Sequence, residues 1–387
     1  MNIVVLADSF PPYLSGVTTI CVELARELLK RGNKVLIFTP DHPNKIRPPG
    51  LESAKILYLS SFSTHVPGLR ICFPNTFKVV KEIRKFQADI IETEAPSFLG
   101  IDGIIASKVL KVPSVSVFHT LLVSNKYLQI IFKTKSDLIE KISWIYHRWF
   151  YNAGDMIFVW TKQMADLLTK NGIEKRKIEI MTPLFDYHNV KILRKDTVKK
   201  AKEKYSLNKN VAVFLGRVSP EKRLDFLIQV WSQVVKVNKD CTLLIIGDGL
   251  YMSQLKRLVS YYKLEEYVRF TGLIEHEMLL SSGILSACDL FVSASISETF
   301  GLTGIEAMAH GIPVVLAKSQ GLAEMVKDAG FVCQADDADC FKESILEIFD
   351  NLDLKRKMGK KARETSKNYS TPVVVGKILN KYENLVN

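Results

Sequence analysis

The stretch DLFVSASISETFGLTGIEAMAHGIPVVLAK (289–318) decides the fold of this chain. Two short apolar runs, 289–295 and 313–318, stand on either side of a segment with helical spacing, 302–310. Strand, helix and strand within about 30 residues are typical of a βαβ unit, whose parallel strands are buried beneath helices. The stretch therefore predicts an α/β protein.

The same alternation extends in both directions from this stretch. Strands are predicted at 2–8, 34–40, 88–93, 113–119, 155–160, 210–217, 241–249, 267–272, 289–295 and 313–318. Helices are predicted at 17–31, where Gly32 provides a stop, and at 75–87, 98–110, 136–152, 162–171, 221–237, 250–263, 276–287, 302–310 and 338–350. The rhythm restarts after a charged segment, which predicts two doubly wound, Rossmann-like parallel sheets facing across a cleft.

The length of 387 residues also suits two domains. We expect an N-terminal domain over 1–187, a basic connector over 188–209 and a C-terminal domain over 210–369. No apolar run is long enough for a membrane-spanning helix, and the N-terminus has no export signal, which favours a cytoplasmic location. The six cysteines show no CxxC pairing, so we expect free thiols in a reducing compartment.

The net charge of +12 is unevenly distributed. Residues 1–187 carry 24 basic and 17 acidic side chains, residues 191–204 carry 7 and 2, and the remainder is neutral. Such a surplus indicates an anionic partner, which could be a substrate, a nucleic acid or a lipid surface. Ordinary solubilising lysines on helix faces would explain the charge equally well.

The loop and helix within 297–315 carry the most informative residues. Glu298 precedes the helix and Glu306 lies on it, where carboxylates could hold sugar and ribose hydroxyls. Phe300, Gly301 and Leu302 mark the helix N-terminus, whose free N–H groups favour a phosphate. The plainer interpretation is a strand–loop–helix unit with two solvated glutamates.

A second strand-to-helix turn, FLGRVSPEKRLD (214–225), carries Arg217 and Lys222. Together these cations could neutralise a diphosphate, although both could also be surface charges. Gly16 opens the first helix and Gly249 ends a GDG turn, so both could let backbone approach phosphates, or could simply make turns. No GxGxxG dinucleotide motif is present.

His119 ends the predicted strand 113–119 at its carboxyl edge. A histidine there could hydrogen-bond a sugar or assist a proton transfer, or could be structural. The acidic residues Asp336, Asp337 and Asp339 precede a predicted helix, and capping explains them better than a metal site.

These motifs resemble the retaining glycosyltransferases of family 4, which have the two-domain GT-B fold, and the similarity runs nearly end to end. The resemblance implies that Glu298 holds the donor sugar and Glu306 the ribose. It implies that Arg217 and Lys222 bind the diphosphate, while His119 touches the transferred sugar. Gly16 matches a further family position, and the last helix, about 370–387, would pack back on the first domain. A nucleotide-sugar would be a co-substrate, with no cofactor and no metal required.

The region 118–162 resembles a narrower group that acts on diacylglycerol and phosphatidylinositol. Its aromatic residues beside cations suit a membrane interface, or equally a core: Trp144, Tyr146, Trp149, Phe150 and Tyr151. The segment 75–86 places Lys78, Lys81 and Lys85 on one helical face. We therefore predict transfer to a lipid or lipid-linked acceptor at an anionic membrane, on the inner face of the plasma membrane, with no nucleic-acid partner. A soluble or polysaccharide acceptor is the alternative, and a nucleotide-sugar epimerase is a more remote one.

Overall fold

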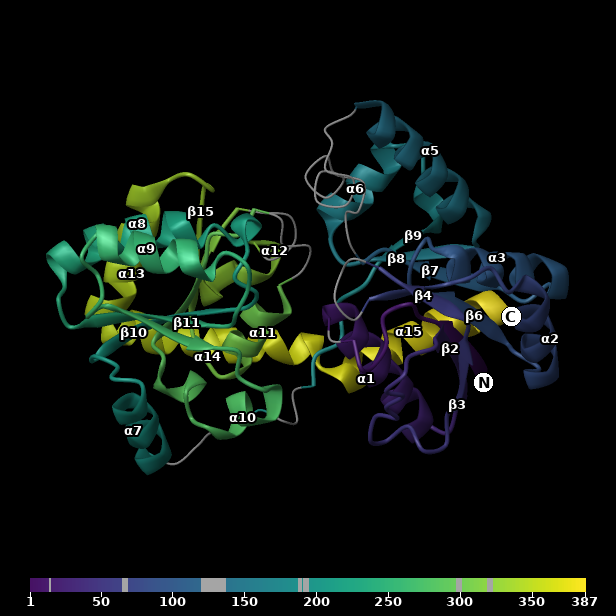
Figure 1. The fold of residues 1–387 in the computed structure, drawn as a ribbon, viewed down its shortest axis with the longest axis horizontal. Helices are drawn as coiled ribbons and strands as arrows, with labels where there is room; N and C mark the ends of the chain where they lie inside the picture. Colours follow the sequence, from purple (N-terminus) through teal and green to yellow (C-terminus); the bar gives the residue numbers. More distant parts are fainter. Residues whose placement is uncertain are drawn as a thin grey trace. The chain divides into compact units, whose positions relative to one another are not determined.

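The computed structural model describes residues 1–13, 15–64, 69–119, 137–186, 190, 195–296, 301–318 and 323–387. The chain forms two compact units, which Figure 1 shows as separate α/β bodies. Unit 1 contains Met1–Leu184 and Thr371–Asn387, and unit 2 contains Phe185–Ser370. Each unit is described below by itself.

Unit 1 is built on a parallel sheet with the order β3-β2-β1-β6-β7-β8-β9 among its described residues. The strands are β1 (Asn2–Leu6), β2 (Lys34–Pro40), β3 (Lys55–Leu59), β6 (Ile90–Thr93), β7 (Ser114–Val117), β8 (Met156–Val159) and β9 (Ile178–Ile180). The helices are α1 (Gly16–Lys30), α2 (Thr76–Phe86), α3 (Phe98–Leu110), α5 (Asp137–Ala153), α6 (Lys162–Lys170), α15 (Thr371–Val386) and the 3-10 helix η1 (Lys175–Lys177). A small antiparallel pair, β4 (Ser61–Ser63) and β5 (Arg70–Cys72), forms a separate two-stranded sheet.

Unit 2 repeats this plan with the order β12-β11-β10-β13-β14-β15 among its described residues. Its strands are β10 (Asn210–Leu215), β11 (Cys241–Ile246), β12 (Val268–Gly272), β13 (Leu290–Ser293), β14 (Val314–Ala317) and β15 (Gly330–Cys333). Its α-helices are α7 (Lys195–Lys204), α8 (Leu224–Val237), α9 (Met252–Tyr261), α10 (His276–Ser281), α11 (Leu302–Ala309), α12 (Ala323–Val326), α13 (Ala338–Asp350) and α14 (Leu352–Ser366). Short 3-10 helices are η3 (Pro220–Lys222), η4 (Leu285–Ala287), η5 (Lys327–Ala329) and η6 (Lys367–Tyr369).

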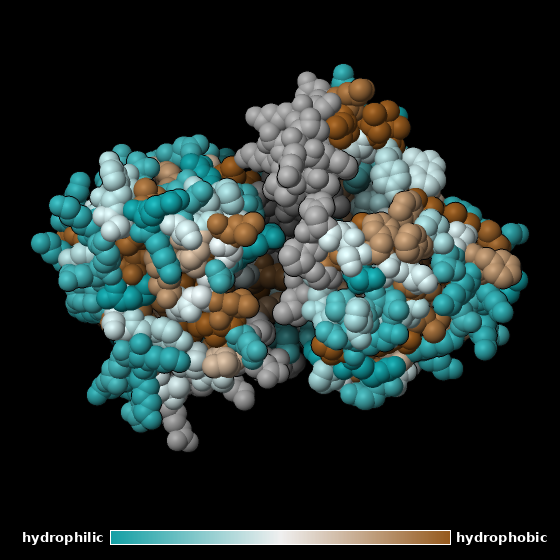
Figure 2. All heavy atoms as spheres, in the orientation of Figure 1, coloured by the Kyte–Doolittle hydropathy of each residue, from teal (hydrophilic) through white to brown (hydrophobic). Residues whose placement is uncertain are grey.

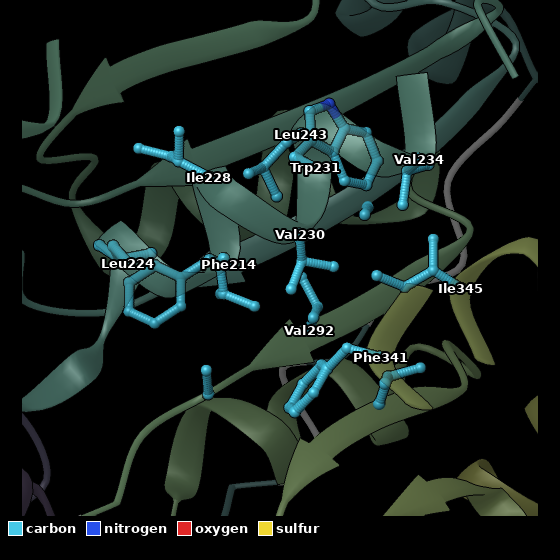
Figure 3. Packing of buried hydrophobic residues seen from close by; sticks show 14 of the residues in the cluster. Phe214, Leu224, Ile228, Val230, Trp231, Val234, Leu243, Val292, Phe341 and Ile345 are labelled. Carbon is cyan, nitrogen blue, oxygen red and sulfur yellow. The ribbon is translucent and has the colours of Figure 1, made fainter. Parts of the chain in front are cut away.

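Both sheets are doubly wound, as the alternation of strands and helices predicts. In each sheet the chain starts in the middle, builds outward in one direction and then reverses, which places a switch point between β1 and β6 and another between β10 and β13. The core of unit 2 lies between its sheet and the helices α8 and α13, where Trp231 and Phe341 are fully buried (Figure 3). Burial of these large side chains is the main stabilising contribution to the unit.

The C-terminal helix α15 belongs to unit 1, in which it packs against α1. Tyr382 is buried and stacks on Phe158 of β8, with 6.2 Å between the ring centroids. Lys381 forms an ion pair of 2.8 Å with Glu179 of β9. The chain therefore leaves unit 1 near Leu184 and returns to it for its last helix.

Two sequence predictions differ from the structure in unit 2. Much of the expected connector is the helix α7, which packs against η4 within the unit. The expected helix 276–287 is interrupted between α10 and η4, because Gly283 adopts a φ of 77°. A Cβ there would lie 3.1 Å from the carbonyl oxygen of Thr197, so glycine also allows α7 to approach closely.

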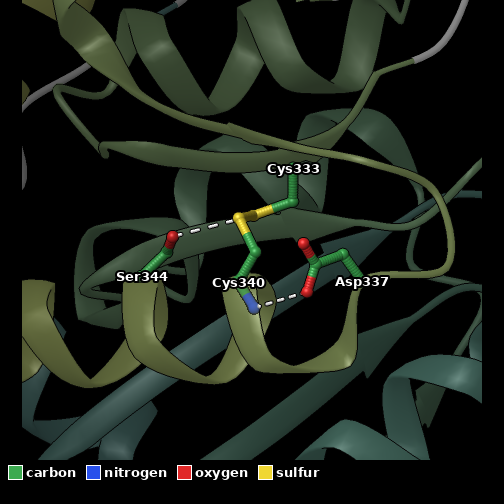
Figure 4. Close-up of a disulfide and its surroundings, with 4 residues drawn as sticks. All are labelled: Cys333, Asp337, Cys340 and Ser344. Atoms are coloured by element: carbon green, nitrogen blue, oxygen red, sulfur yellow. Dashed lines mark hydrogen bonds between the residues drawn. A yellow bond between two sulfur atoms is a disulfide. The ribbon is translucent and has the colours of Figure 1, made fainter.

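The expectation that all six cysteines are free thiols is wrong for Cys333 and Cys340, which form a disulfide (Figure 4). Cys333 ends β15 and Cys340 lies in the first turn of α13, which brings their Cα atoms to 5.7 Å. Asp337 caps this helix by accepting a hydrogen bond of 3.0 Å from the backbone N–H of Cys340. The capping predicted for the acidic segment is thus confirmed at Asp337.

Candidate active site

In unit 2, the loops that follow β10 and β11 touch each other through their backbones. The N–H of Gly216 donates to the carbonyl of Ile246 at 3.0 Å, and the N–H of Val218 donates to that of Asp248 at 2.9 Å. A Cβ at Gly249 would lie only 2.2 Å from the carbonyl oxygen of Val218. The predicted residue Gly249 therefore allows two loops at the carboxyl edge of the sheet to pack together.

Arg217 and Lys222 lie on the loop that leads from β10 through η3 into α8. The Arg217 side chain is exposed and its guanidinium stands 3.8 Å from the carboxylate of Glu221. Lys222 is half-buried and its N–H closes the turn on Ser219 at 3.0 Å. The next residue, Arg223, has a left-handed φ of 52° and forms an ion pair with Asp336 at 2.5 Å. This anchoring fixes the backbone on which both predicted diphosphate ligands lie.

The helix α11 follows β13 at the same edge of the sheet. Gly301 precedes it with a φ of 74°, a conformation that glycine adopts without strain, and Leu302 is its first residue. Glu306 lies in the second turn and is buried. Glu298 and Phe300 lie outside the described residues.

The switch point of unit 2 brings these two loops close to each other. β10 and β13 are hydrogen-bonded neighbours, so the loop of Arg217 and the loop before α11 leave the same edge side by side. The hydroxyl of Ser295, after β13, donates to the carbonyl of Glu221 at 3.5 Å. Two cations and a helix N-terminus at one strand edge can hold an anionic diphosphate.

Unit 1 places the predicted residues Gly16 and His119 at the carboxyl edge of its own sheet. Gly16 is the first residue of α1, and Ser15 caps that helix by accepting a hydrogen bond from the N–H of Thr18 at 3.1 Å. His119 follows β7, is buried and packs beside Trp160 with 5.3 Å between ring centroids. Gly16 therefore opens the helix that follows β1, and His119 lies after β7, one strand away from the switch point between β1 and β6.

Sequence reasoning missed Glu94, which contacts His119, and two further carboxylates at the carboxyl edge of this sheet. Glu94 follows β6, and its carboxylate hydrogen-bonds Nε2 of His119. Burial raises the pKa of Asp8, after β1, to about 6, although a hydrogen bond from Ser97 opposes this effect. Burial and the nearby charge of Glu94 also raise the pKa of Glu92. The available signal was the sequence ETE at the end of a predicted strand, which resembles many polar strand ends.

The structure of the outer helices in unit 1 partly corrects the prediction of which residues could face a membrane. On α5, Phe150 and Tyr151 are fully buried and belong to the core, whereas Trp149 is exposed. The large apolar residues exposed on this helix are Leu138, Ile142, Ile145 and Trp149. Figure 2 shows this hydrophobic stretch on the surface of α5. Spacing by three and four residues places all four on one face.

The basic face of α2 is present as predicted. Lys78, Lys81 and Lys85 are exposed, while Ile83 is buried against the body of the unit. Phe77 is 86% exposed on the outer surface. A shallow cavity of about 310 Å³ is lined by Phe77, Val80, Lys81, Arg84 and Lys85.

A larger cavity of about 580 Å³ does not coincide with the predicted site. It lies at the amino ends of β13 and β14, where Asp289 and Pro313 line it, at the opposite edge of the sheet from Arg217. Within the described ranges, no cluster of three histidine, cysteine, aspartate or glutamate side chains has the geometry of a metal site. Those ranges also contain no helix long and apolar enough to cross a membrane.

Two family models match consecutive parts of the chain. The model "Glycosyltransferase Family 4" matches residues 14–187, and the model "Glycosyl transferases group 1" matches residues 195–365. The two matches correspond closely to the two sheets described above.

Individual relatives are distant but cover most of the chain. An alpha-monoglucosyldiacylglycerol synthase of Streptococcus pneumoniae is 27% identical over 86% of this chain and 74% of its own length. A GDP-mannose-dependent alpha-mannosyltransferase of Mycolicibacterium smegmatis is 24% identical over 99% of this chain and 97% of its own. The crystal structure of Anabaena Alr3699/HepE in complex with UDP has a TM-score of 0.81 at 20% identity and covers both chains completely. That structure supports the fold.

Proposed function

The chain belongs to the family 4 glycosyltransferases of the GT-B fold and is a hexosyltransferase, and from this premise we propose its donor chemistry, acceptor and place of action. It moves a sugar from a nucleotide-sugar to a lipid or lipid-linked acceptor at a membrane surface, with retention of the anomeric configuration and without a metal. The observation that carries this proposal is the pair of cations Arg217 and Lys222 at the switch point of unit 2.

The bond that breaks during the transfer explains why cations are needed. When the bond from the sugar C1 to the phosphate oxygen breaks, negative charge develops on the departing nucleoside diphosphate. Arg217 and Lys222 stabilise that charge more in the transition state than in the ground state, which is what accelerates the reaction. The N-terminus of α11 at Gly301 and Leu302, together with Phe300 and the turn at Gly249, completes the donor site.

The remaining predicted residues hold the rest of the donor. Glu306 accepts hydrogen bonds from the ribose hydroxyls, Glu298 from the hydroxyls of the sugar, and His119 contacts the transferred sugar. Gly16 lets the first loop approach the phosphates. For retention, the acceptor oxygen bonds to C1 on the face that the phosphate leaves, and the acceptor proton passes to the departing phosphate oxygen.

The lipid acceptor is supported by relatives and by the surface of unit 1. The Streptococcus pneumoniae relative is named for diacylglycerol chemistry, whereas the name of the mannosyltransferase specifies no acceptor. The helices α2, α3 and α5 pack in that order along the unit. The exposed apolar residues of α5 and the basic cavity of α2 both lie on the surface of this unit.

These two features suit the two zones of an anionic bilayer. The stripe of Leu138, Ile142, Ile145 and Trp149 can enter the boundary between head groups and acyl chains, as monotopic helices do. Lys141 and Arg148 are also exposed on α5, and the lysines of α2 add further positive charge. Such residues are attracted to the anionic cytoplasmic leaflet, so we place the enzyme on the inner face of the plasma membrane.

The decisive experiment is a donor and acceptor panel. Purified protein is incubated with UDP-, GDP- or ADP-sugars and with either diacylglycerol-containing anionic vesicles or soluble glycans, in the presence of EDTA. We expect glycolipid from one donor, with the donor's anomeric configuration by NMR. Glycan product without glycolipid would favour the soluble-acceptor alternative, and conversion of the donor alone would favour an epimerase.

A pair of variants tests the site within that assay. Lys222→Ala should lower kcat by at least 100-fold, because removing one oxyanion donor typically costs that much. Lys236→Ala, an exposed lysine on α8 in the same unit, is the matched control and should retain wild-type transfer. Equal activity of the two variants would overturn the assignment of the diphosphate site.

A further inference from the structure

A buried polar cluster in unit 1 surrounds His119, and its carboxylates have no part in the transfer chemistry described so far. His119 and Glu94 are hydrogen-bonded through Nε2 and Oε2, and their side chains are only 5% and 1% exposed. The two residues follow the neighbouring strands β7 and β6. Cys21, on α1, lies beside them, because burial and the nearby charges of Glu94 and Glu92 raise the pKa of its thiol. The cluster therefore joins three elements at the carboxyl edge of the sheet.

Two oxygens of this cluster lack partners among the described residues. They are Oε1 of Glu94 and Oε2 of Glu92, which are both buried. Two ionised carboxylates could not satisfy each other, and a buried oxygen without a partner is costly. A proton on Glu92 would let it donate to Glu94 and remove both deficits. Burial and the charge of Glu94 raise the pKa of Glu92 well above its ordinary range, which agrees with a neutral Glu92.

The arrangement then has one negative charge with donors around it. Glu94 accepts a hydrogen bond from Nε2 of His119, and a protonated Glu92 would be a second donor to it. A carboxylate that receives Nε2–H fixes both the tautomer and the ring orientation of an imidazole, as carboxylate–histidine pairs do elsewhere. The Nδ1 atom is then left with a lone pair for another partner.

We infer that Glu94 is a positioning residue, which holds His119 with its proton on Nε2 and its Nδ1 directed to a hydroxyl of the transferred sugar. The contact between His119 and the sugar rests on the proposed function. The tautomer of His119 does not depend on that function. Glu92 supports Glu94 as a neutral hydrogen-bond donor. The cluster thus serves the reaction through the orientation of His119, without contact between Glu94 and the substrate.

The tautomer can be measured in the wild-type protein. In protein labelled with ¹⁵N-histidine, the ring nitrogens of His119 are assigned by comparison with His119→Ala, and their chemical shifts distinguish a protonated from an unprotonated nitrogen. We expect protonated Nε2 and unprotonated Nδ1 at pH 7.5. The opposite tautomer would overturn the inference, whether or not transfer activity is found.

Kinetics of Glu94→Gln then test the positioning role. We expect kcat to fall about 10- to 100-fold, as for other supporting partners of a functional histidine. The dissociation constant of the free nucleoside diphosphate, which lacks the transferred sugar, should stay unchanged, because Arg217, Lys222 and Glu306 lie in unit 2. Wild-type kcat for Glu94→Gln would overturn the positioning role.

Two further variants separate this role from a merely structural one. Glu92→Gln should lower kcat less than Glu94→Gln does, because an amide can still donate to Glu94. Ser116→Ala removes the buried hydrogen bond of 2.9 Å to Thr93 on the same two strands and is the control for local packing. It should retain wild-type kcat. If wild-type protein transfers no sugar from any donor, the proposed function fails, while the NMR result still decides the tautomer.

Discussion

Replacing Ile142 and Ile145 of α5 by serine should weaken binding to anionic vesicles by about 30-fold. The two side chains are 56% and 58% exposed, so together they offer slightly more than one isoleucine's worth of surface to a membrane. Full burial of an isoleucine contributes about 2 kcal/mol, and this free energy corresponds to roughly 30-fold in a binding constant. Because both residues face solvent, we expect the free energy of unfolding to change by less than about 0.5 kcal/mol.

The assay is co-sedimentation with vesicles that contain anionic phospholipid, at low and high salt. A matched control replaces Val237 and Leu352 of unit 2 by serine, since these are 67% and 52% exposed and lie on α8 and α14. The control should bind as the wild type does. High salt should weaken the vesicle binding of the wild type and of the Ile142/Ile145 double serine variant, because it screens the lysines. It should not remove the difference in binding between these two proteins. Binding of the double serine variant within threefold of wild type would refute the apolar stripe as a membrane contact.

Three further predictions concern single residues outside the membrane-facing helices. Gly249→Ala should lower nucleotide affinity by at least 10-fold in calorimetry, because the new Cβ meets the carbonyl of Val218 at 2.2 Å and forces two donor loops apart; unchanged affinity would argue against that loop contact. Asp8 has its pKa raised to about 6, so the folded state binds this proton more tightly than the unfolded chain, and stability should fall by up to about 3 kcal/mol as pH rises from about 4 to 6. Asp8→Asn should abolish that part of the slope in urea unfolding curves, and parallel curves for both proteins would contradict it. Cys340→Ser should cost about 2.5 kcal/mol, since the link to Cys333 closes a loop with a separation of 7 residues; an unchanged midpoint of thermal unfolding, with and without reductant, would contradict it.

The fold was largely predictable because both sheets consist of short apolar strands separated by amphipathic helices. β3 and α14 were missed, since KILYL (55–59) is a half-exposed edge strand and LDLKRKMGKKARETS (352–366) is too polar for an apolar stripe to stand out. The disulfide was missed because no sequence rule pairs a strand end with the first helical turn that follows it. The spacing of apolar residues along the chain identified most helices and strands. It does not show which of them contact each other.

The same limit applies to the candidate site. Arg217 and Lys222 were identified because their spacing in one loop is visible in the sequence, and the structure places them on that loop. Glu94 was missed because its importance depends on β6 lying beside β7, which only the sheet order reveals. On α5, the sequence identified an aromatic helix but not its orientation, so it left open whether Phe150 faces a membrane or the core in which it is buried.

The distribution of charge in unit 1 bears on what the acceptor presents to the site. The carboxyl edge of its sheet holds Asp8, Glu92 and Glu94, whereas the exposed cations of α2 and α5 lie on the outer side. An anionic group brought to the strand ends would meet a negative Glu94 in a site of low dielectric, where the repulsion is strong. A neutral hydroxyl would instead find hydrogen-bond acceptors. We therefore expect the acceptor to react through an uncharged hydroxyl, with any phosphate of the acceptor or its membrane held by the basic outer helices.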